Sequence, residues 1–239
     1  NDGMRLNTKF DTYALLAWSL QALREAAEHP ATGRFHPESL KEKFIQTLVS
    51  LSVTEDGPRQ AREYLGKAGI TLLALPHLAH TYLDGAIFLA AENRPVIVMT
   101  LRYDRLDNFW FVLLHELGHL KLGHLSDERA WIADDLELPA SDSQREMDAD
   151  AFANTMLLPL DFSLDAQAKV SASEILRYAQ EHGVSPAIVA GRIQHAKNDY
   201  RIFANLIGRN EVRKYFPREG GGWDKLGPRE QATSPNSCR

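Results

Sequence analysis

The sequence has almost no cysteine and no long hydrophobic run. Its one cysteine, Cys238, is the second residue from the end, which excludes an internal disulfide framework and a cysteine-rich metal site. No apolar run is longer than Phe109 to Leu114, far short of the roughly 18 residues that a membrane-spanning helix needs. These absences favour a cytoplasmic protein without a membrane span.

The chain also lacks an excess of positive charge. Its formal net charge is −5 and its pI is near 6.0, so nucleic-acid binding by the whole surface is not predicted. With 239 residues, of which 44% are hydrophobic, the chain can bury a sizeable core in one large or two modest domains. It begins with Asn1 and has no signal-peptide layout, so we expect a fragment or a processed product.

Apolar spacing, caps and turn residues predict a mixed α+β fold. Helices are expected at 7–28, from Pro37, from Pro58, at 107–125, 144–158, 171–182 and 186–197, with a further one over 200–215. Short runs rich in Ile and Val predict a small sheet made of Ile70–Ala74, Ala86–Ala90 and Val96–Thr100. Residues 126–143 read as an acidic connector, and the tail from Arg218 has too few apolar residues to order itself.

Two histidines and a glutamate follow one another at the spacing of a catalytic metal site. His115 and His119 are one helical turn apart, so both imidazoles face one ion. Glu116 lies about 100° around the helix, where it can act as general base on the attacking water without being a ligand. The spacing also arises by chance, but this helix is apolar nearly all round, and burying such polar groups is costly unless a metal satisfies them.

A catalytic zinc ion usually takes three protein ligands, so a third is expected downstream. On a helix over 144–158, Glu146 lies about 50° from the centre of the apolar stripe and Asp148 about 110° away on the far side. Glu146 is therefore the better third ligand, and Asp150, one turn on, is placed to accept a hydrogen bond from a ligating histidine. The alternative is that these acids are solvated residues at the positive end of a helix.

His124 is not predicted to be a ligand. The metzincin pattern requires glycine and histidine three and six residues after the second histidine, whereas Gly123 and His124 follow His119 by four and five. If the helix continued, the His124 side chain would point away from the ligand face. A favourable charge at the helix C-terminus is the expected role.

Two sequence blocks resemble the ImmA/IrrE metallopeptidases. The first is Phe111-Val-Leu-Leu-His115-Glu-Leu-Gly-His119, preceded by Arg94-Pro-Val-Ile-Val98. The second is Glu146-x-x-Ala149-Asp150-x-Phe152-Ala153-x-x-x-Leu157-Leu158-Pro159. The resemblance covers about residues 60–160, and both blocks in this order are more specific than the first alone.

This resemblance implies a zincin-like core around a small mixed sheet, in a bacterial or phage protein that cleaves or disables a helix-turn-helix repressor. It implies His115, His119 and Glu146 as zinc ligands and Glu116 as general base; a site with two histidines and one glutamate also holds manganese in vitro. The expected organisation is N-terminal helices over 1–56, the core over 57–165, a helical C-terminal extension over 166–216 and a disordered tail over 217–239. Family members often carry a DNA-binding domain at the N-terminus, and a chain that starts at Asn1 is consistent with its removal.

Two parts of the site stay open. The group that stabilises the oxyanion is sought among His80, Tyr82, Arg102 and Tyr103, near the sheet, each of which also fits a structural role. In zincins an edge strand binds the substrate in extended form, and Val96–Thr100 is the candidate, the alternative being an ordinary core strand.

Two rival functions remain. A regulatory module that does not cut would use the helix-turn-helix-like segment 171–197; residues 174–216 hold seven Lys/Arg against four Asp/Glu. By contrast, residues 126–150 hold nine acids against two arginines, which would repel phosphates and favour a basic protein substrate, or simply keep a loop solvated. The second rival is a hydrolase of small amides, which a closed pocket would favour over an open groove.

Overall fold

A computed structural model describes residues 12–77, 83–90, 93–125, 131–133, 140–158 and 170–217. Three helices, α1 (Thr12–Glu28), α2 (Glu42–Ser50) and α3 (Gly57–Lys67), precede the first strand. All three were expected, although the segment that starts at Pro37 begins as a 3-10 turn, Pro37–Ser39. The expected start of the first helix, at residue 7, lies outside the described residues.

The sheet is small and mixed, with the strand order β1-β3-β2-β4. Strand β1 (Thr71–Ala74) runs parallel to β3 (Arg94–Met99), and β2 (Gly85–Ala90) runs antiparallel to both β3 and β4 (Trp131–Ala133). The expected α+β class with a small mixed sheet is confirmed. The sequence missed β4, which lies inside the segment assigned to an acidic connector.

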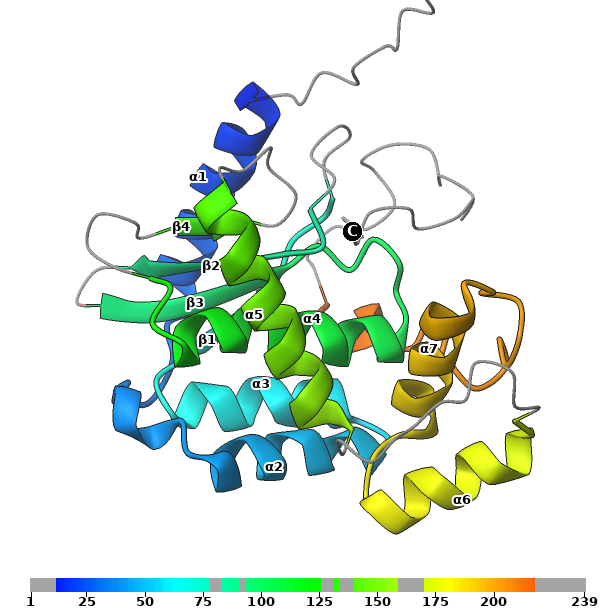
Figure 1. Ribbon diagram of the computed structural model, residues 1–239. Coiled ribbons are helices and arrows are strands. Elements are labelled where there is room, and N and C mark those ends of the chain that lie inside the picture. Colours follow the sequence, from blue (N-terminus) through cyan, green and yellow to red (C-terminus); the bar gives the residue numbers. More distant parts are fainter. Residues whose placement is uncertain are drawn as a thin grey trace, which may run out of the picture.

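Alternate residues of the strands face opposite layers, as the two-residue repeat of a strand requires. On one face, Leu73, Phe88 and Val98 pack in a cluster with Trp18 and Ala22 of α1. On the other face, strand residues join the large core around α4 (Leu106–Lys121). Figure 1 shows the result, with α1 on one side of the sheet and α4 on the other.

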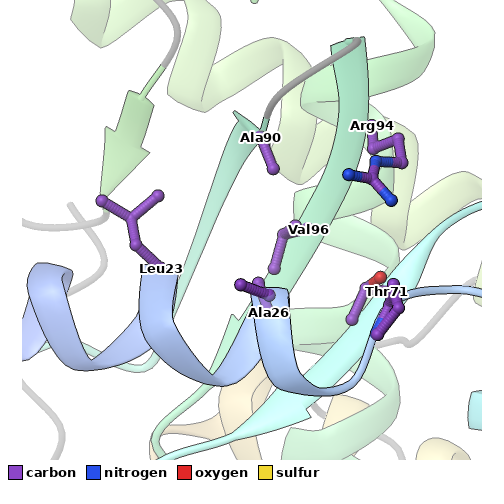
Figure 2. Close-up of a pocket in the computed structure, with 8 residues that line it drawn as sticks. Leu23, Ala26, Thr71, Ala90, Arg94 and Val96 are labelled. Atoms are coloured by element: carbon purple, nitrogen blue, oxygen red, sulfur yellow. The ribbon is translucent and has the colours of Figure 1, made fainter.

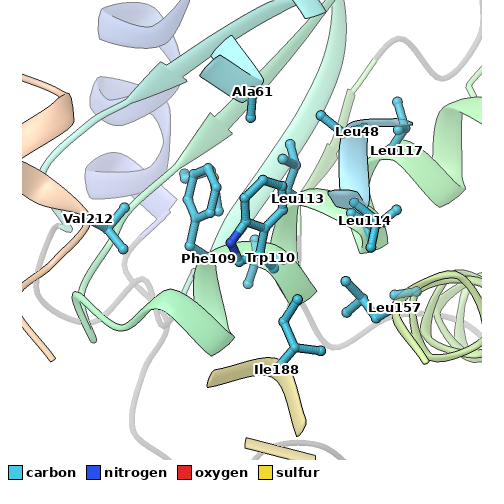
Figure 3. Close-up of a cluster of buried hydrophobic side chains, with 14 of the residues drawn as sticks. Leu48, Ala61, Phe109, Trp110, Leu113, Leu114, Leu117, Leu157, Ile188 and Val212 are labelled. Atoms are coloured by element: carbon cyan, nitrogen blue, oxygen red, sulfur yellow. The ribbon is translucent and has the colours of Figure 1, made fainter. Parts of the chain in front are cut away.

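Helix α4 is the centre of the larger core. Its residues Phe109, Trp110 and Leu113 are almost fully buried. Figure 3 shows side chains from other elements packed around them, among them Leu48, Ala61, Leu157, Ile188 and Val212. The core includes residues from both the predicted N-terminal helices and the predicted C-terminal extension, while the predicted domain boundaries themselves stay a prediction.

The remaining helices are α5 (Ala140–Leu157), α6 (Ala172–His182) and α7 (Pro186–Lys197). Helix α6 begins with a capping box, in which the Ser171 side chain accepts from the Glu174 amide and the Glu174 side chain accepts from the Ser171 amide. The helix expected over 200–215 is wrong: this segment forms turns and one short 3-10 helix, Arg213–Tyr215. In the described ranges, no helix is long and apolar enough to cross a bilayer.

Candidate metal centre

Helix α4 aligns His115 and His119 on one face, as their spacing predicts. Their Nε2 atoms are 3.0 Å apart, and the two residues are 6% and 0% exposed. The helix begins at Leu106, one residue before the expected start at 107, and carries Asp107 in its first turn. Burial raises the pKa of Asp107, while a hydrogen bond and the charge of Arg105 oppose that rise.

Helix α5 crosses α4 and brings in the third group (Figure 1). The crossing is close at Gly118, where an added Cβ would lie 3.0 Å from the Phe152 ring and 3.3 Å from the Ala149 Cα. The Glu146 Oε2 atom lies 3.2 Å from His115 Nε2, and Oε1 lies 3.5 Å from His119 Nε2. Sequence reasoning missed this role of Gly118; a glycine inside a helix, between the two histidines, was the signal available.

The three groups form one potential ligand set. Their donor atoms all lie within 4.8 Å of one another. Burial raises the pKa of Glu146, but hydrogen bonds and charge interactions with His115 and His119 outweigh it and lower the value to about 2. Glu146 is therefore ionised at neutral pH, as a ligand carboxylate must be.

Each histidine has a partner on its other ring nitrogen. His115 Nδ1 lies 2.9 Å from Asp150 Oδ1, which is where the sequence places Asp150. His119 Nδ1 lies 3.0 Å from His124 Nδ1, so His124 is outside the potential ligand set but contacts one of its histidines, a contact that the sequence did not predict. Burial, followed by the His119 and Arg145 charges, lowers the pKa of His124.

This arrangement fits a divalent metal ion. The two buried imidazoles have hydrogen-bond partners on Nδ1, and a carboxylate lies against their Nε2 atoms. Nitrogen and carboxylate oxygen are the ligands that zinc and similar ions take in catalytic sites. The outer partners fix ring orientation and tautomer in such sites. The residues present therefore fit the ion that the sequence implies, and their roles as ligands stay a prediction.

Glu116 is 0% exposed and lies against the start of strand β2. A Cβ added to Gly85 would overlap Glu116 Oε1 and would lie 2.7 Å from Val112 Cγ1, closer than real contacts come. Gly85 thus leaves the space that the Glu116 carboxylate occupies. No sequence pattern pointed to this residue, because the contact depends on how the sheet packs on α4.

Replacing Gly85 with alanine is expected to displace the Glu116 carboxylate and leave the side chains of the potential ligand set in place. Since small displacements of a general base cost up to about 100-fold in rate, we expect any hydrolysis that uses Glu116 as general base to fall about 10- to 100-fold while metal content stays unchanged. Gly66→Ala is the control, because nothing lies within 4 Å of an added Cβ there. Equal activity of the two variants would show that Glu116 tolerates the extra methyl group.

Other residues considered for the site have different partners. Arg102 Nε forms a 2.9 Å ion pair with Asp84, and its guanidinium lies over the Tyr103 ring, which supports a structural role for this pair. Asp148 is exposed and accepts a hydrogen bond from Gln144. His80 and Tyr82 lie outside the described residues.

Strand β3 is not an edge strand. It pairs with β1 along one side and with β2 along the other, so the expectation that Val96–Thr100 binds substrate by strand addition is wrong. Within the described part of the sheet, β1 and β4 are the edges. Of the two, β4 pairs with β2, the strand that begins beside Glu116.

A separate hollow of about 220 Å³ lies between the second half of α1 and the sheet. Figure 2 shows it lined by Leu23, Ala26, Thr71, Ala90, Arg94 and Val96. The lining is mostly apolar and includes none of the three residues of the potential ligand set. This hollow is therefore distinct from the candidate metal site.

Comparison with known families agrees with this geometry. The family model of peptidase M78, described as the IrrE N-terminal-like domain, matches residues 66–194. The match contains the four strands, α4, α5, α6 and most of α7. A search of curated proteins found no significant match.

Proposed function

Because the chain belongs to the peptidase M78 family of IrrE N-terminal-like domains, a metallopeptidase family, we propose that it is a zinc endopeptidase that cleaves a helix-turn-helix repressor. The observation that carries the proposal is the ligand set of His115, His119 and Glu146 with its donor atoms within 4.8 Å. Glu116, on the same helix turn, supplies the general base.

The spacing of the donor atoms supports zinc. Around a tetrahedral zinc ion with ligands at 2.0–2.1 Å, two ligand atoms are about 3.3 Å apart. The two histidine nitrogens are 3.0 Å apart, and Glu146 faces them with different oxygens, Oε2 at 3.2 Å from His115 Nε2 and Oε1 at 3.5 Å from His119 Nε2. With one oxygen per carboxylate the donor atoms lie within 4.8 Å of one another, so the set would contract slightly to hold zinc, and manganese is the alternative ion.

In the proposed reaction the chain's own residues hold the ion and move the proton. The bound ion would polarise the scissile carbonyl and make the attacking water more acidic. Glu116 takes a proton from the water as the water oxygen bonds to the carbonyl carbon. It then returns the proton to the leaving amine as the carbon–nitrogen bond breaks.

The charge near the site favours a basic substrate. Helix α5 is acidic, and its Asp148 is exposed and outside the ligand set, whereas DNA-binding domains of repressors are basic on the face that contacts phosphate. An extended segment of such a protein would add to the sheet at β4 by main-chain hydrogen bonds. These features support a protein substrate over a small amide.

The test is cleavage of a candidate repressor, starting with one encoded beside the gene. The zinc-loaded protein is expected to cut it, a chelator to stop the cutting, and added zinc to restore it. The reason is that the bound ion is the Lewis acid of the proposed reaction. Products are read by mass spectrometry. A protein that holds no stoichiometric metal after metal-replete purification would overturn the metal site, and chelator-insensitive cutting would overturn the mechanism.

The alternative is a regulatory module that does not cut and that binds DNA through α6 and α7. In helix-turn-helix domains the second helix enters the major groove. Here Ala187, Ile188, Val189, Ala190 and Ile193 of α7 are buried, and α7 packs on α4. The burial leaves little of the α7 surface available to contact the major groove of DNA, so the peptidase is the better supported function.

A further inference from the structure

We propose that His124 is a positioning residue for the metal centre: its Nδ1 atom accepts a hydrogen bond from the Nδ1–H of His119 and so holds His119 Nε2 toward the ion. This inference rests on the proposed metal site. In this proposal, His124 in the turn after α4 is to His119 what Asp150 is to His115, the hydrogen-bond partner of Nδ1.

The hydrogen bond is the first observation. His119 Nε2 faces the other two donors, at 3.0 Å from His115 Nε2 and 3.5 Å from Glu146 Oε1. A nitrogen that binds a metal carries no proton, so in neutral His119 the proton is on Nδ1. His119 is fully buried, and a buried N–H needs an acceptor. His124 Nδ1, 3.0 Å away, is that acceptor.

The turn that ends α4 is the second observation, because it explains how His124 reaches this place. Gly123 has a φ of +71°, a left-handed conformation that glycine adopts readily. The His124 amide then donates to the His119 carbonyl at 3.0 Å, a hydrogen bond typical of a glycine-ended helix. The chain reverses there, and the His124 ring lies with its centroid 5.1 Å from the His119 ring, at 68°.

The two histidines therefore have independent partners. The acceptor for His115 comes from α5, whereas the acceptor for His119 comes from the turn directly after its own helix. Outer partners of this kind typically change metal affinity by about 10- to 100-fold when they are removed. A histidine that only interacted with the end of α4 would not change metal affinity to that extent.

The test compares His124→Phe with His124→Asn. Phenylalanine keeps a ring and removes the acceptor, whereas the Asn Oδ1 atom is the same number of bonds from the backbone as His Nδ1. We expect Phe to weaken zinc binding about 10- to 100-fold in chelator competition and Asn to recover most of the loss. Visible absorption of the Co²⁺-substituted proteins should change with Phe and resemble the parent with Asn. His195→Phe, an exposed histidine near the end of α7, is the control.

The outcomes are distinguishable. A parent protein without metal would overturn both the proposed function and this inference. A parent that binds zinc, with His124→Phe binding equally well, would overturn the inference alone, as would His124→Asn binding no better than Phe. If the Phe variant does not fold, judged by circular dichroism of the metal-free protein, His124→Ala takes its place in the same comparison.

Discussion

Glutamine in place of Glu116 is expected to leave the metal bound and to lower peptide cleavage by about 1,000-fold, within the range of about 100- to 10,000-fold for a general acid–base. The amide has nearly the shape of the carboxylate, so it fits the space beside Gly85. It cannot take a proton from the water. Metal binding is unaffected because Glu116 is outside the ligand set of His115, His119 and Glu146.

The measurement is initial cleavage rate at saturating zinc, with metal content determined on the same sample. Glu181→Gln is the matched control, since Glu181 is on the surface of α6 and pairs with Arg177 there. This control should cut at the parental rate. If Glu116→Gln cuts as fast as the control, the general base is another group; if it loses the metal, Glu116 holds the ion directly or indirectly.

Local periodicity was enough to predict the two helices that carry the potential ligands. The four-residue spacing of His115 and His119 fixes one face of α4 whatever the rest of the chain does. The apolar stripe of α5 then selects Glu146 over Asp148, because burying Ala149 and Ala153 turns Glu146 toward α4 and leaves Asp148 exposed. Both inferences depend only on the geometry of a single helix and on which side of it is buried.

Strand order could not be predicted in the same way. Val96–Thr100 has the composition of a strand, but its central place comes from pairing with β1 and β2, and pairing partners are set by the whole fold. Strand β4 has three residues within an acidic segment, so no alternating pattern was long enough to indicate it.

Two other errors came from assuming that a helix continues. Positive φ at Phe203, Gly208 and Asn210 breaks the segment expected to be helical over 200–215. Hydrogen bonds to residues outside the segment hold it in place. The Gln194 side chain donates to the Ile202 carbonyl, and the buried Asp104 carboxylate accepts from the Val212 and Arg213 amides.

The second of these errors misplaced His124. A helix continued past Lys121 would carry the His124 side chain off the ligand face, whereas the left-handed Gly123 brings it back to His119. A glycine near a predicted helix end was a signal for this turn. In the sequence, Gly123 served only to exclude the metzincin pattern, so the contact between His124 and His119 was not predicted.

Glu146→Ala is expected to lower zinc affinity by more than the roughly 10- to 100-fold that follows loss of an outer partner. The change removes the only carboxylate in the ligand set and leaves two imidazoles, 3.0 Å apart at Nε2. Zinc usually keeps three protein ligands in catalytic sites. Binding to the native state raises thermal stability by mass action, so zinc should raise the melting temperature of the parent and not that of this variant.

Asp148→Ala is the matched control for this prediction, because it removes an acid two residues further along the same helix. Asp148 is exposed, accepts a hydrogen bond from Gln144 and is outside the ligand set, so its removal should leave zinc affinity unchanged. The comparison separates a ligand from the general negative charge of α5, which both variants reduce equally. Full metal retention by Glu146→Ala, with loss in Asp148→Ala, would mean that the opposite face of α5 carries the third ligand in solution.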